Sequence, residues 1–361
     1  KLFLQIRKAN SREAIEAVFD RPPVLIGRSK ICDLVIDDGI SARLASDRFL
    51  MSTTSGHAAY VLNWLEEWLQ CEWTGLRVYC TGVTEQWATV SLTGPESRKL
   101  MAELTDEIAL DAASFPFMSW RTGRVAGIPA RIMRVSFTGD LSFEINVPAS
   151  WGQALWQACM AAGEKYGIVP YGTEAIHVLR AEKGYFIVGR ETDGTTTAAD
   201  LGAGWMVDMS KPDFIGKRSL LRSDTARDDR RQLVGLETEN PSEVIPEGTQ
   251  IVGELYPKPP MPMIGYVSSS YFSPNCGRSI ALAMVDDGRR RMGDTVSLPL
   301  GRARLSCTEP PSTAVRSGTV VSASIEAPLR GRVPHRGLVP SHLLQDLFKA
   351  PSASFTATAT T

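Results

Sequence analysis

A change in hydrophobic pattern near Gln232 limits the fold of this chain more than any other feature. Before this point, segments with helical spacing of apolar residues alternate with strand-like segments. After it come short β-like runs with frequent Gly and Pro, such as QLVGLETEN, QIVGEL, MIGYVSSS and SIALAMV. Short strands separated by turn residues are typical of small barrels. We therefore predict an α+β chain in which residues 232–300 form a separate C-terminal β-barrel.

The region before the barrel contains the predicted helices. Apolar residues at helical spacing predict helices over 57–70, 96–104 and 152–166, the last one ending at Gly167. A further helix is predicted to begin near Thr173. These helices alternate with strands, which supports a mixed fold.

Strands are predicted over 87–94 and within 125–148, where Gly127 and the segment 138–140 mark turns. Further upstream, ICDLVIDDGISARL contains two extended runs around an acidic turn, and DRFLMSTTSG predicts another strand. The pattern indicates a hairpin in this part of the chain.

Composition excludes several classes of protein. A chain of 361 residues with 43% apolar residues can bury a large core and is expected to divide into two or three packed units. Its formal net charge is -1, so no overall positive field attracts nucleic acid. No apolar run reaches the roughly 18 residues that span a membrane, and KLFLQIRKAN lacks the apolar core of a secretion signal. We expect a soluble cytoplasmic protein that binds neither nucleic acid nor membranes.

The cysteines do not form a metal-binding pattern. They occur without a CxxC pair or a Cys and His spacing typical of zinc. We therefore expect reduced thiols and no metal site. The six cysteines are Cys32, Cys71, Cys80, Cys159, Cys276 and Cys307.

Three acidic positions are candidates for chemistry, each with a simpler alternative. Asp37 and Asp38 form the acidic turn in IDDGIS, and Asp-Gly is a common turn pair that solvent can satisfy. Glu144 alternates with Phe143 in LSFEINVP and could be an ordinary solvent-facing strand residue. Glu182 lies in line with the apolar stripe of TEAIHVLRAEKGY, where a structural ion pair is as plausible as a ligand contact.

Several long motifs carry a family resemblance. VSFTGDLSFEINVP, YGTEAIHVLRAEKGYFIVGRETDG, LGAGWMVDMSKPDFIGKRSL and SSSYFSPNCGRSIALAMV resemble the C-terminal half of the α subunit of heterotetrameric sarcosine oxidase. More distantly, they resemble the glycine-cleavage T-protein, an aminomethyltransferase. The similarity runs from about Asp33 to about Leu300. It implies a T-protein-like fold of mixed subdomains around a central folate channel, ending in a small β-barrel.

The resemblance also implies a reaction and its partners. Tetrahydrofolate would capture the imine or formaldehyde released during sarcosine oxidation and become 5,10-methylenetetrahydrofolate. The amine-oxidising flavin would belong to a partner subunit, so this chain alone should not oxidise sarcosine. Expected partners are the β, γ and δ-like subunits of sarcosine oxidase. A fixed carboxylate beside the folate nitrogens would aid proton loss and stabilise positive charge.

Individual residues match family positions. Asp38 matches the catalytic carboxylate expected to orient folate and stabilise the iminium, with Asp37 beside it. Glu144 matches a position suited to accept the amide and amino donors of the pterin. Arg180 matches a folate-site arginine. Glu182 and Tyr185 match neighbouring cofactor-binding positions of less defined role. Trp205 falls in a matching motif too, and we expect it to be a buried core residue.

The two ends depart from the family pattern. Residues 1–30 do not reproduce the family's first strand and helix, and no GxGxxG marks a dinucleotide-binding half. Residues 31–231 are predicted to form the aminomethyltransferase-like domain. Residues 301–361 are an atypical tail, expected to be disordered because they are rich in Arg, Ser, Thr and Pro. The alternative function is therefore a non-catalytic folate-binding or scaffold subunit with a truncated site.

Overall fold

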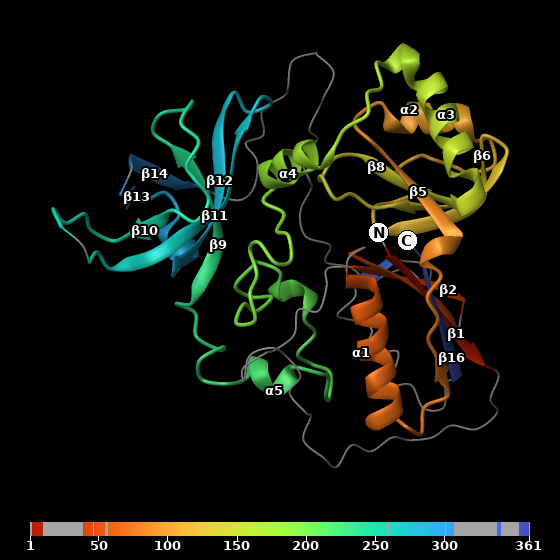
Figure 1. Ribbon diagram of the computed structural model, residues 1–361, viewed down its shortest axis with the longest axis horizontal. Helices are drawn as coiled ribbons and strands as arrows, with labels where there is room; N and C mark the ends of the chain where they lie inside the picture. Colours follow the sequence, from red (N-terminus) through yellow and green to blue (C-terminus); the bar gives the residue numbers. More distant parts are fainter. Residues whose placement is uncertain are drawn as a thin grey trace.

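The structure is a computed structural model that describes residues 2–9, 39–45, 47–54, 57–258, 260–299, 301–306, 338–340 and 354–360. Three parts are visible in Figure 1: a β-barrel, a four-stranded sheet covered by two helices, and a second sheet beside one long helix. The helix α4 (Thr173–Glu182) lies between the four-stranded sheet and the barrel. This arrangement confirms the mixed α+β fold with a C-terminal barrel.

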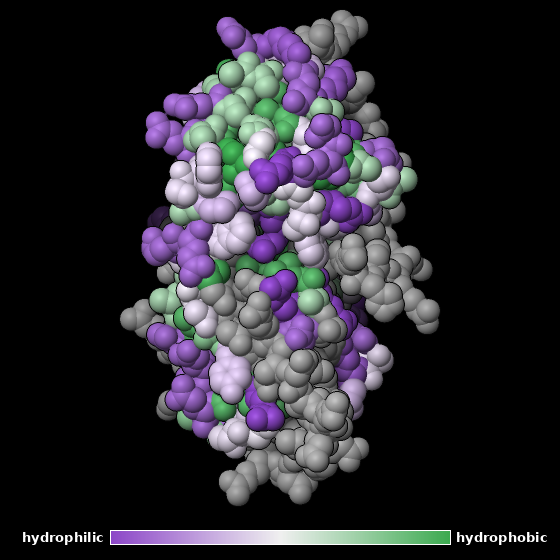
Figure 2. All heavy atoms as spheres, turned by 90° about the vertical axis from the view of Figure 1, so that its right-hand side faces the viewer, coloured by the Kyte–Doolittle hydropathy of each residue, from purple (hydrophilic) through white to green (hydrophobic). Residues whose placement is uncertain are grey.

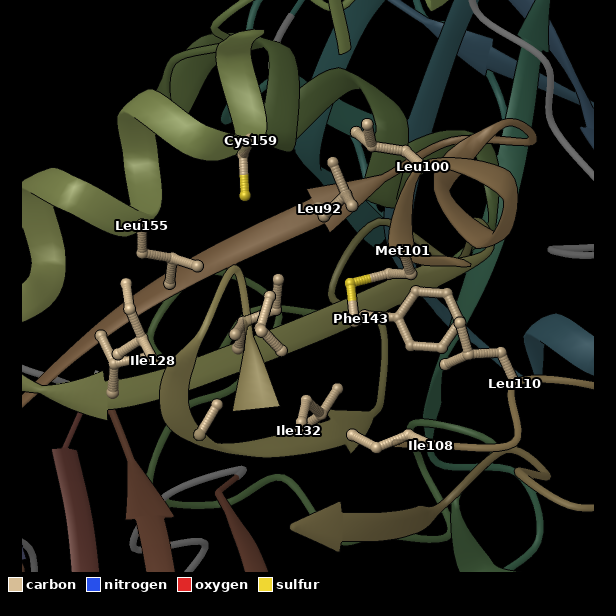
Figure 3. Close-up of a cluster of buried hydrophobic side chains, with 14 of the residues drawn as sticks. Leu92, Leu100, Met101, Ile108, Leu110, Ile128, Ile132, Phe143, Leu155 and Cys159 are labelled. Carbon is tan, nitrogen blue, oxygen red and sulfur yellow. The ribbon is translucent and has the colours of Figure 1, made fainter. Parts of the chain in front are cut away.

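The four-stranded sheet is antiparallel, with the strand order β5-β8-β7-β6. The helices α2 (Ser97–Leu104) and α3 (Gly152–Gly163) cover one of its faces. Figure 3 shows Met101 of α2 beside Phe143 of the sheet, and Leu155 of α3 beside Ile128. The strands are β5 (Trp87–Thr93), β6 (Ser119–Val125), β7 (Ile128–Arg134) and β8 (Ser142–Pro148).

The end of α3 follows the sequence prediction with one difference. The α-helix ends at Gly163, and a short 3-10 turn (Glu164–Tyr166) completes the predicted segment. Gly167 then adopts a left-handed conformation with φ 66°, which a residue without Cβ adopts at little cost.

The second sheet has the strand order β15-β2-β3-β1-β16, and β4 pairs with β1. The helix α1 (Ala58–Cys71) buries Val61 and Leu65 against Phe49 and Met51 of β3. This helix is the one predicted from helical spacing over 57–70. The strands are β1 (Leu2–Ala9), β2 (Ile40–Ala45), β3 (Arg48–Thr53), β4 (Val78–Tyr79), β15 (Leu338–Pro340) and β16 (Ser354–Thr360).

The predicted hairpin is present as β2 and β3, which pair antiparallel and are joined through Asp47. ISARL forms the first strand of this hairpin. The run before it, including Asp37 and Asp38, lies outside the described residues.

The barrel is closed, with the order β10-β11-β12-β9-β14-β13. Its seam joins β10 to β13 through Val252 and Ser297, whereas β11 and β12 pair along their length from Gly265 to Ser273. The strands are β9 (Arg231–Thr238), β10 (Gln250–Val252), β11 (Met263–Ser273), β12 (Arg278–Asp286), β13 (Thr295–Leu298) and β14 (Gly301–Ser306).

The barrel extends beyond residue 300, the end predicted from sequence. β14 pairs with both β9 and β13, so the barrel lacks closure without it. GRARLS is polar and short, which is why its apolar pattern did not mark it as a strand. The strands β15 and β16 also fall within the tail expected to be disordered, and the remainder of that tail lies outside the described residues.

The surface carries scattered apolar side chains. In Figure 2, they show in the upper half of the view, at the height where α2 and α3 lie in Figure 1. No helix in the described part of the chain is both long and apolar enough to cross a membrane. Within the same part, the thiols of Cys71, Cys80, Cys159 and Cys276 are free.

Candidate functional site

The face of the four-stranded sheet opposite α2 and α3 carries buried polar side chains. Strand alternation sends Phe143 and Ile145 of β8 into the apolar core and Glu144 and Asn146 to the other face. Glu144 is only 4% exposed, so the alternative of a solvent-facing residue is wrong. A buried carboxylate is unfavourable unless polar groups or a ligand stabilise its charge. This polar face of β8 is therefore the first part of the candidate site.

Hydrogen bonds order the polar face. The Thr89 hydroxyl donates to Oδ1 of Asn146 over 2.7 Å, and Nδ2 of Asn146 donates to the carbonyl of Arg131 over 3.1 Å. At the other end of the face, the hydroxyl of Thr93 lies 2.9 Å from that of Ser142 and 3.1 Å from that of Tyr171. Glu144 lies between these two ordered groups, so its surroundings are held in place before any ligand binds.

The hairpin β2–β3 covers part of this polar face. Met133, opposite Glu144 in the β7–β8 register, packs with Ala42 and Leu50 of the hairpin. At the start of β2, Gly39 lies so close to the Ser52 carbonyl that a Cβ atom would overlap it. A glycine is therefore required directly after the acidic pair. Asp37 and Asp38 themselves lie outside the described residues, so the catalytic role of Asp38 and the binding role of Asp37 stay predictions.

Arg180 of α4 is fully buried at 0% exposure. Its Nη1 lies 3.0 Å from Oε2 of Glu191 and donates to the Tyr185 carbonyl over 2.9 Å, and its Nη2 donates to the Ser269 hydroxyl over 2.5 Å. Glu191 also accepts from Ser269 and from the backbone N–H of Ile187. We call Arg180, Glu191, Ser269 and the 185–191 segment the Arg180 network; it ties the end of α4 to the barrel strand β11.

Glu182 also contacts the barrel. Its Oε1 accepts a hydrogen bond from the Ser273 hydroxyl over 2.6 Å, and both of its carboxylate oxygens accept from Nδ2 of Asn275. Among the described contacts, the Glu182 carboxylate thus accepts hydrogen bonds from uncharged side chains at the end of β11. The ion pair considered from sequence is not among these contacts. They hold α4 against the barrel.

Tyr185 lies where α4, the four-stranded sheet and the barrel meet. Burial, and to a smaller extent the nearby Asp140 carboxylate, raise the pKa of its hydroxyl, which stays protonated at neutral pH. On the same side, Gly139 packs against the side chain of Lys183 and adopts φ 83°. The loop before β8 is therefore fitted against the end of α4, which sets the polar face of β8 relative to Tyr185.

The structure thus joins Arg180 directly with Tyr185, places Glu182 on the barrel side of α4, and places Glu144 on the sheet. Which of these side chains contact a ligand stays a prediction. Trp205 differs from expectation: it is 62% exposed, so it is not a core residue. Its motif lies in a loop with a short 3-10 turn (Gly204–Met206) that leaves the ring at the surface.

Sequence reasoning missed three residues of this region. Glu191 is spaced eleven residues from its partner Arg180, and no local pattern links them. Arg131 and Arg48 sit on the polar side of β7 and of the hairpin, and strand alternation with Met133 and Leu50 could have indicated their direction. In the described part of the chain, no cluster of His, Cys, Asp or Glu is suited to a metal.

A shallow hollow lies between α2 and α3. It is lined by Glu103, Ala161, Ala162, Glu164 and Lys165, on the far side of the sheet from Glu144. Lys165 and Glu103 pair across it at 2.7 Å. This position, away from every predicted site residue, indicates a surface feature rather than a reaction site.

Known proteins resemble both halves of the chain. Residues 32–211 match the family described as the GCVT N-terminal domain, and residues 231–311 match the glycine cleavage T-protein C-terminal barrel domain. An aminomethyltransferase from Halothermothrix orenii is 30% identical over 73% of this chain, which covers 70% of that protein.

A sarcosine oxidase subunit alpha from Corynebacterium sp. (strain P-1) is 44% identical over 82% of this chain. The chain covers 32% of that protein, so it spans about a third of the length of this relative. Among solved structures, the glycine cleavage system aminomethyltransferase T from Bartonella henselae superposes with a TM-score of 0.64 at 20% identity, covering 85% of this chain and 82% of its own. This last likeness concerns the fold.

Proposed function

This chain belongs to the glycine-cleavage T-protein family, and from that premise we propose that it binds tetrahydrofolate and loads a one-carbon unit onto it. The relatives named sarcosine oxidase subunit alpha support a one-carbon unit derived from sarcosine, as formaldehyde or an imine from a flavin-containing partner. The β, γ and δ-like subunits of such an oxidase are the proposed partners. The observation that carries the proposal is the buried carboxylate of Glu144 on the polar face of β8.

Glu144 suits the pterin ring of tetrahydrofolate. The ring offers an amide N–H next to an amino group, and one carboxylate can accept both hydrogen bonds. Burial strengthens these bonds because little water competes for the carboxylate. The ordered Thr89 and Asn146 on one side and Ser142 and Tyr171 on the other would limit the ring to one orientation.

The chemistry of the transfer lies in tetrahydrofolate itself: its N5 and N10 amines take up the carbon of formaldehyde, and one water molecule is released. The chain would contribute a fixed negative charge where positive charge develops, and Asp38 is the proposed source. Gly39, the residue directly after Asp38 in the sequence, lies against the Ser52 carbonyl.

We propose that Arg180, Glu182 and Tyr185 complete the binding site from the α4 side. Arg180 is fully buried in its network, which supports a role in holding Tyr185 and the 185–191 segment in place. Glu182 would act in the same way through Ser273 and Asn275 of the barrel. Tyr185, half-buried and protonated, would be the hydrogen-bonding side chain that this framework presents to the ligand.

Calorimetry with 5-formyltetrahydrofolate tests the proposal. Glu144→Gln keeps the size of the side chain but replaces one acceptor oxygen with a donor, so affinity should fall roughly 10- to 100-fold, the loss of a charge-assisted hydrogen bond. Glu174→Gln, at an 81% exposed side chain on α4, is the matched control and should bind normally. Equal affinity of Glu144→Gln and the wild-type chain would contradict the assignment of Glu144.

A turnover assay separates this function from the alternative of a non-catalytic folate-binding or scaffold subunit. The wild-type chain should accelerate formation of 5,10-methylenetetrahydrofolate from tetrahydrofolate and formaldehyde, and Asp38→Ala should abolish the acceleration while folate still binds. Binding without any acceleration by the wild-type chain would favour the scaffold.

A further inference from the structure

Two arginines lie on the facing sides of the hairpin and the four-stranded sheet. Leu50 of β3 and Met133 of β7 belong to one buried apolar cluster, and Arg48 and Arg131 each lie two residues before them on their strands. Residues two apart on a strand share a face, so both arginines are on the facing sides of the two sheets. After burial, the charge of Arg48 contributes to lowering the pKa of Arg131, as expected for two guanidinium groups on facing sides.

Neither guanidinium has an acidic partner among the residues that the structure describes. The Nε atoms of Arg48 and Arg131 are both buried and without a hydrogen-bond partner. Burial, followed by repulsion from Arg48, lowers the pKa of Arg131 to about 10. Two like charges in a partly desolvated place repel each other strongly, and a bound anion would turn this repulsion into attraction.

The surroundings limit the shape and charge of that anion. The indole ring of Trp87 covers one face of the Arg131 guanidinium, at 4.7 Å from the ring centre. The edge of the guanidinium donates two parallel N–H groups that match the two oxygens of a carboxylate. Glu144 lies on the same face, opposite Met133, and adds one negative charge beside the two arginines.

We propose that Arg48 and Arg131 form a binding site for a carboxylate group. The carboxylate belongs either to a small free acid or to the glutamyl end of a folate. The existence of the carboxylate site does not depend on the proposed one-carbon transfer. Only its occupation by the glutamyl end of a folate rests on that proposed function. On β3, Leu50 lies between Arg48 and Ser52, the residue whose carbonyl contacts Gly39.

Thermal unfolding in sodium acetate, at constant ionic strength set with chloride, tests the site without folate. Acetate should raise the unfolding midpoint of the wild-type chain but not that of Arg131→Gln or Arg48→Gln. Arg77→Gln is the matched control, because Arg77 is an exposed arginine outside the site, and it should respond as the wild-type chain does. Arg131→Lys keeps the charge but loses the paired donors, so its response should be intermediate.

Calorimetry with p-aminobenzoylglutamate, the tail of folate, and with 6-methyltetrahydropterin, its ring, distinguishes the two sources. If the glutamyl group is the ligand, Arg131→Gln should weaken binding of the tail by about tenfold or more and leave the ring unaffected. If a free acid is the ligand, Arg131→Gln and Arg48→Gln should lose the acetate response but bind both folate fragments as the wild-type chain does.

Two outcomes overturn the proposal. One is an equal acetate response and equal tail affinity in the wild-type chain and in both arginine variants. The other is a wild-type midpoint that rises with inorganic phosphate but not with acetate, which would show an anion site of a different chemistry.

Discussion

Arg180 and Arg131 are both withdrawn from water, yet their surroundings are opposite. Arg180 bonds to the Glu191 carboxylate, the Ser269 hydroxyl and a backbone carbonyl. Arg131 stacks on Trp87 and is close to a second arginine, and no carboxylate pairs with it in the described part of the chain. Arg180 thus has an acidic partner and Arg131 has none among the described residues, although the Nε atom of each lacks a hydrogen-bond partner.

The difference separates residues that hold the fold from residues kept for a ligand. A buried charge with well-placed partners is compatible with stability, whereas removal of one partner leaves an uncompensated charge. A buried charge that lacks a partner lowers stability, and such positions persist where function requires them. The contrast therefore predicts that the two arginines respond in opposite ways to substitution.

The largest expected effect is at Glu191. Glu191→Ala leaves the Arg180 guanidinium buried without its carboxylate, which should lower the free energy of unfolding by about 3–5 kcal/mol. Urea unfolding followed by circular dichroism measures this change. Glu247→Ala removes the exposed partner of Arg190, at 3.0 Å, and should lower it by only about 0–1 kcal/mol. Similar losses in the two variants would break the contrast between buried and exposed pairs.

An intermediate effect distinguishes the two arginines themselves. Arg131→Met removes an unpaired charge and keeps an extended apolar side chain, so the free energy of unfolding without ligand should stay within about 1 kcal/mol of the wild-type value or increase. Arg180→Met, in contrast, leaves the buried Glu191 carboxylate without its arginine partner and should be strongly destabilising. Urea unfolding of both variants in chloride buffer gives the comparison. A loss at Arg131 as large as that at Arg180 would mean that Arg131 supports the fold.

The smallest expected effect is a pH dependence near the Arg180 network. Burial, then the charges of Arg190 and Arg180, lower the pKa of His177 from 6.5, against a weaker opposite effect of Glu174 and Glu247. The unfolded chain therefore binds this proton more readily, so the stability contributed by neutral His177 is present above pH 6.5 and is lost as the pH falls below it.

His177→Gln should remove that part of the acid sensitivity. The difference in free energy of unfolding between wild type and variant should change by less than about 1 kcal/mol between about pH 8 and about pH 5, in favour of the variant at low pH. Urea unfolding at several pH values measures it. A wild-type chain that gains stability relative to His177→Gln on acidification would show that the imidazole is protonated more easily when folded.

Local pattern was sufficient to predict much of the fold. The spacing of Val61, Leu65 and Trp68 determines α1, and the alternation around Phe143 determines which side of β8 carries Glu144. Family resemblance supplied the candidate site residues. What pattern could not predict was how completely the sheet and hairpin bury Glu144, because that depends on the packing of Leu50 against Met133 across two sheets.

Long-range pairs account for the other differences. Arg180 meets Ser269 and Glu191 only when α4 docks on the barrel, and this docking has no signature within either segment. β14 is recognised as a strand through its partners β9 and β13, because its own residues carry too few apolar side chains. Trp205 was expected in the core because of its residue type, whereas the short 3-10 turn that carries it leaves the ring exposed.

The closure of the barrel at Val252 and Ser297 has a consequence for the order in which the barrel comes apart. Strands that share a long run of backbone hydrogen bonds, as β11 and β12 do, separate last, while a short seam opens through local fluctuation. The β10–β13 seam is therefore the place where the barrel opens reversibly, and it is remote in the chain from α4. Amide hydrogens at this seam should exchange first, while β11, which anchors the Arg180 network, stays paired with β12.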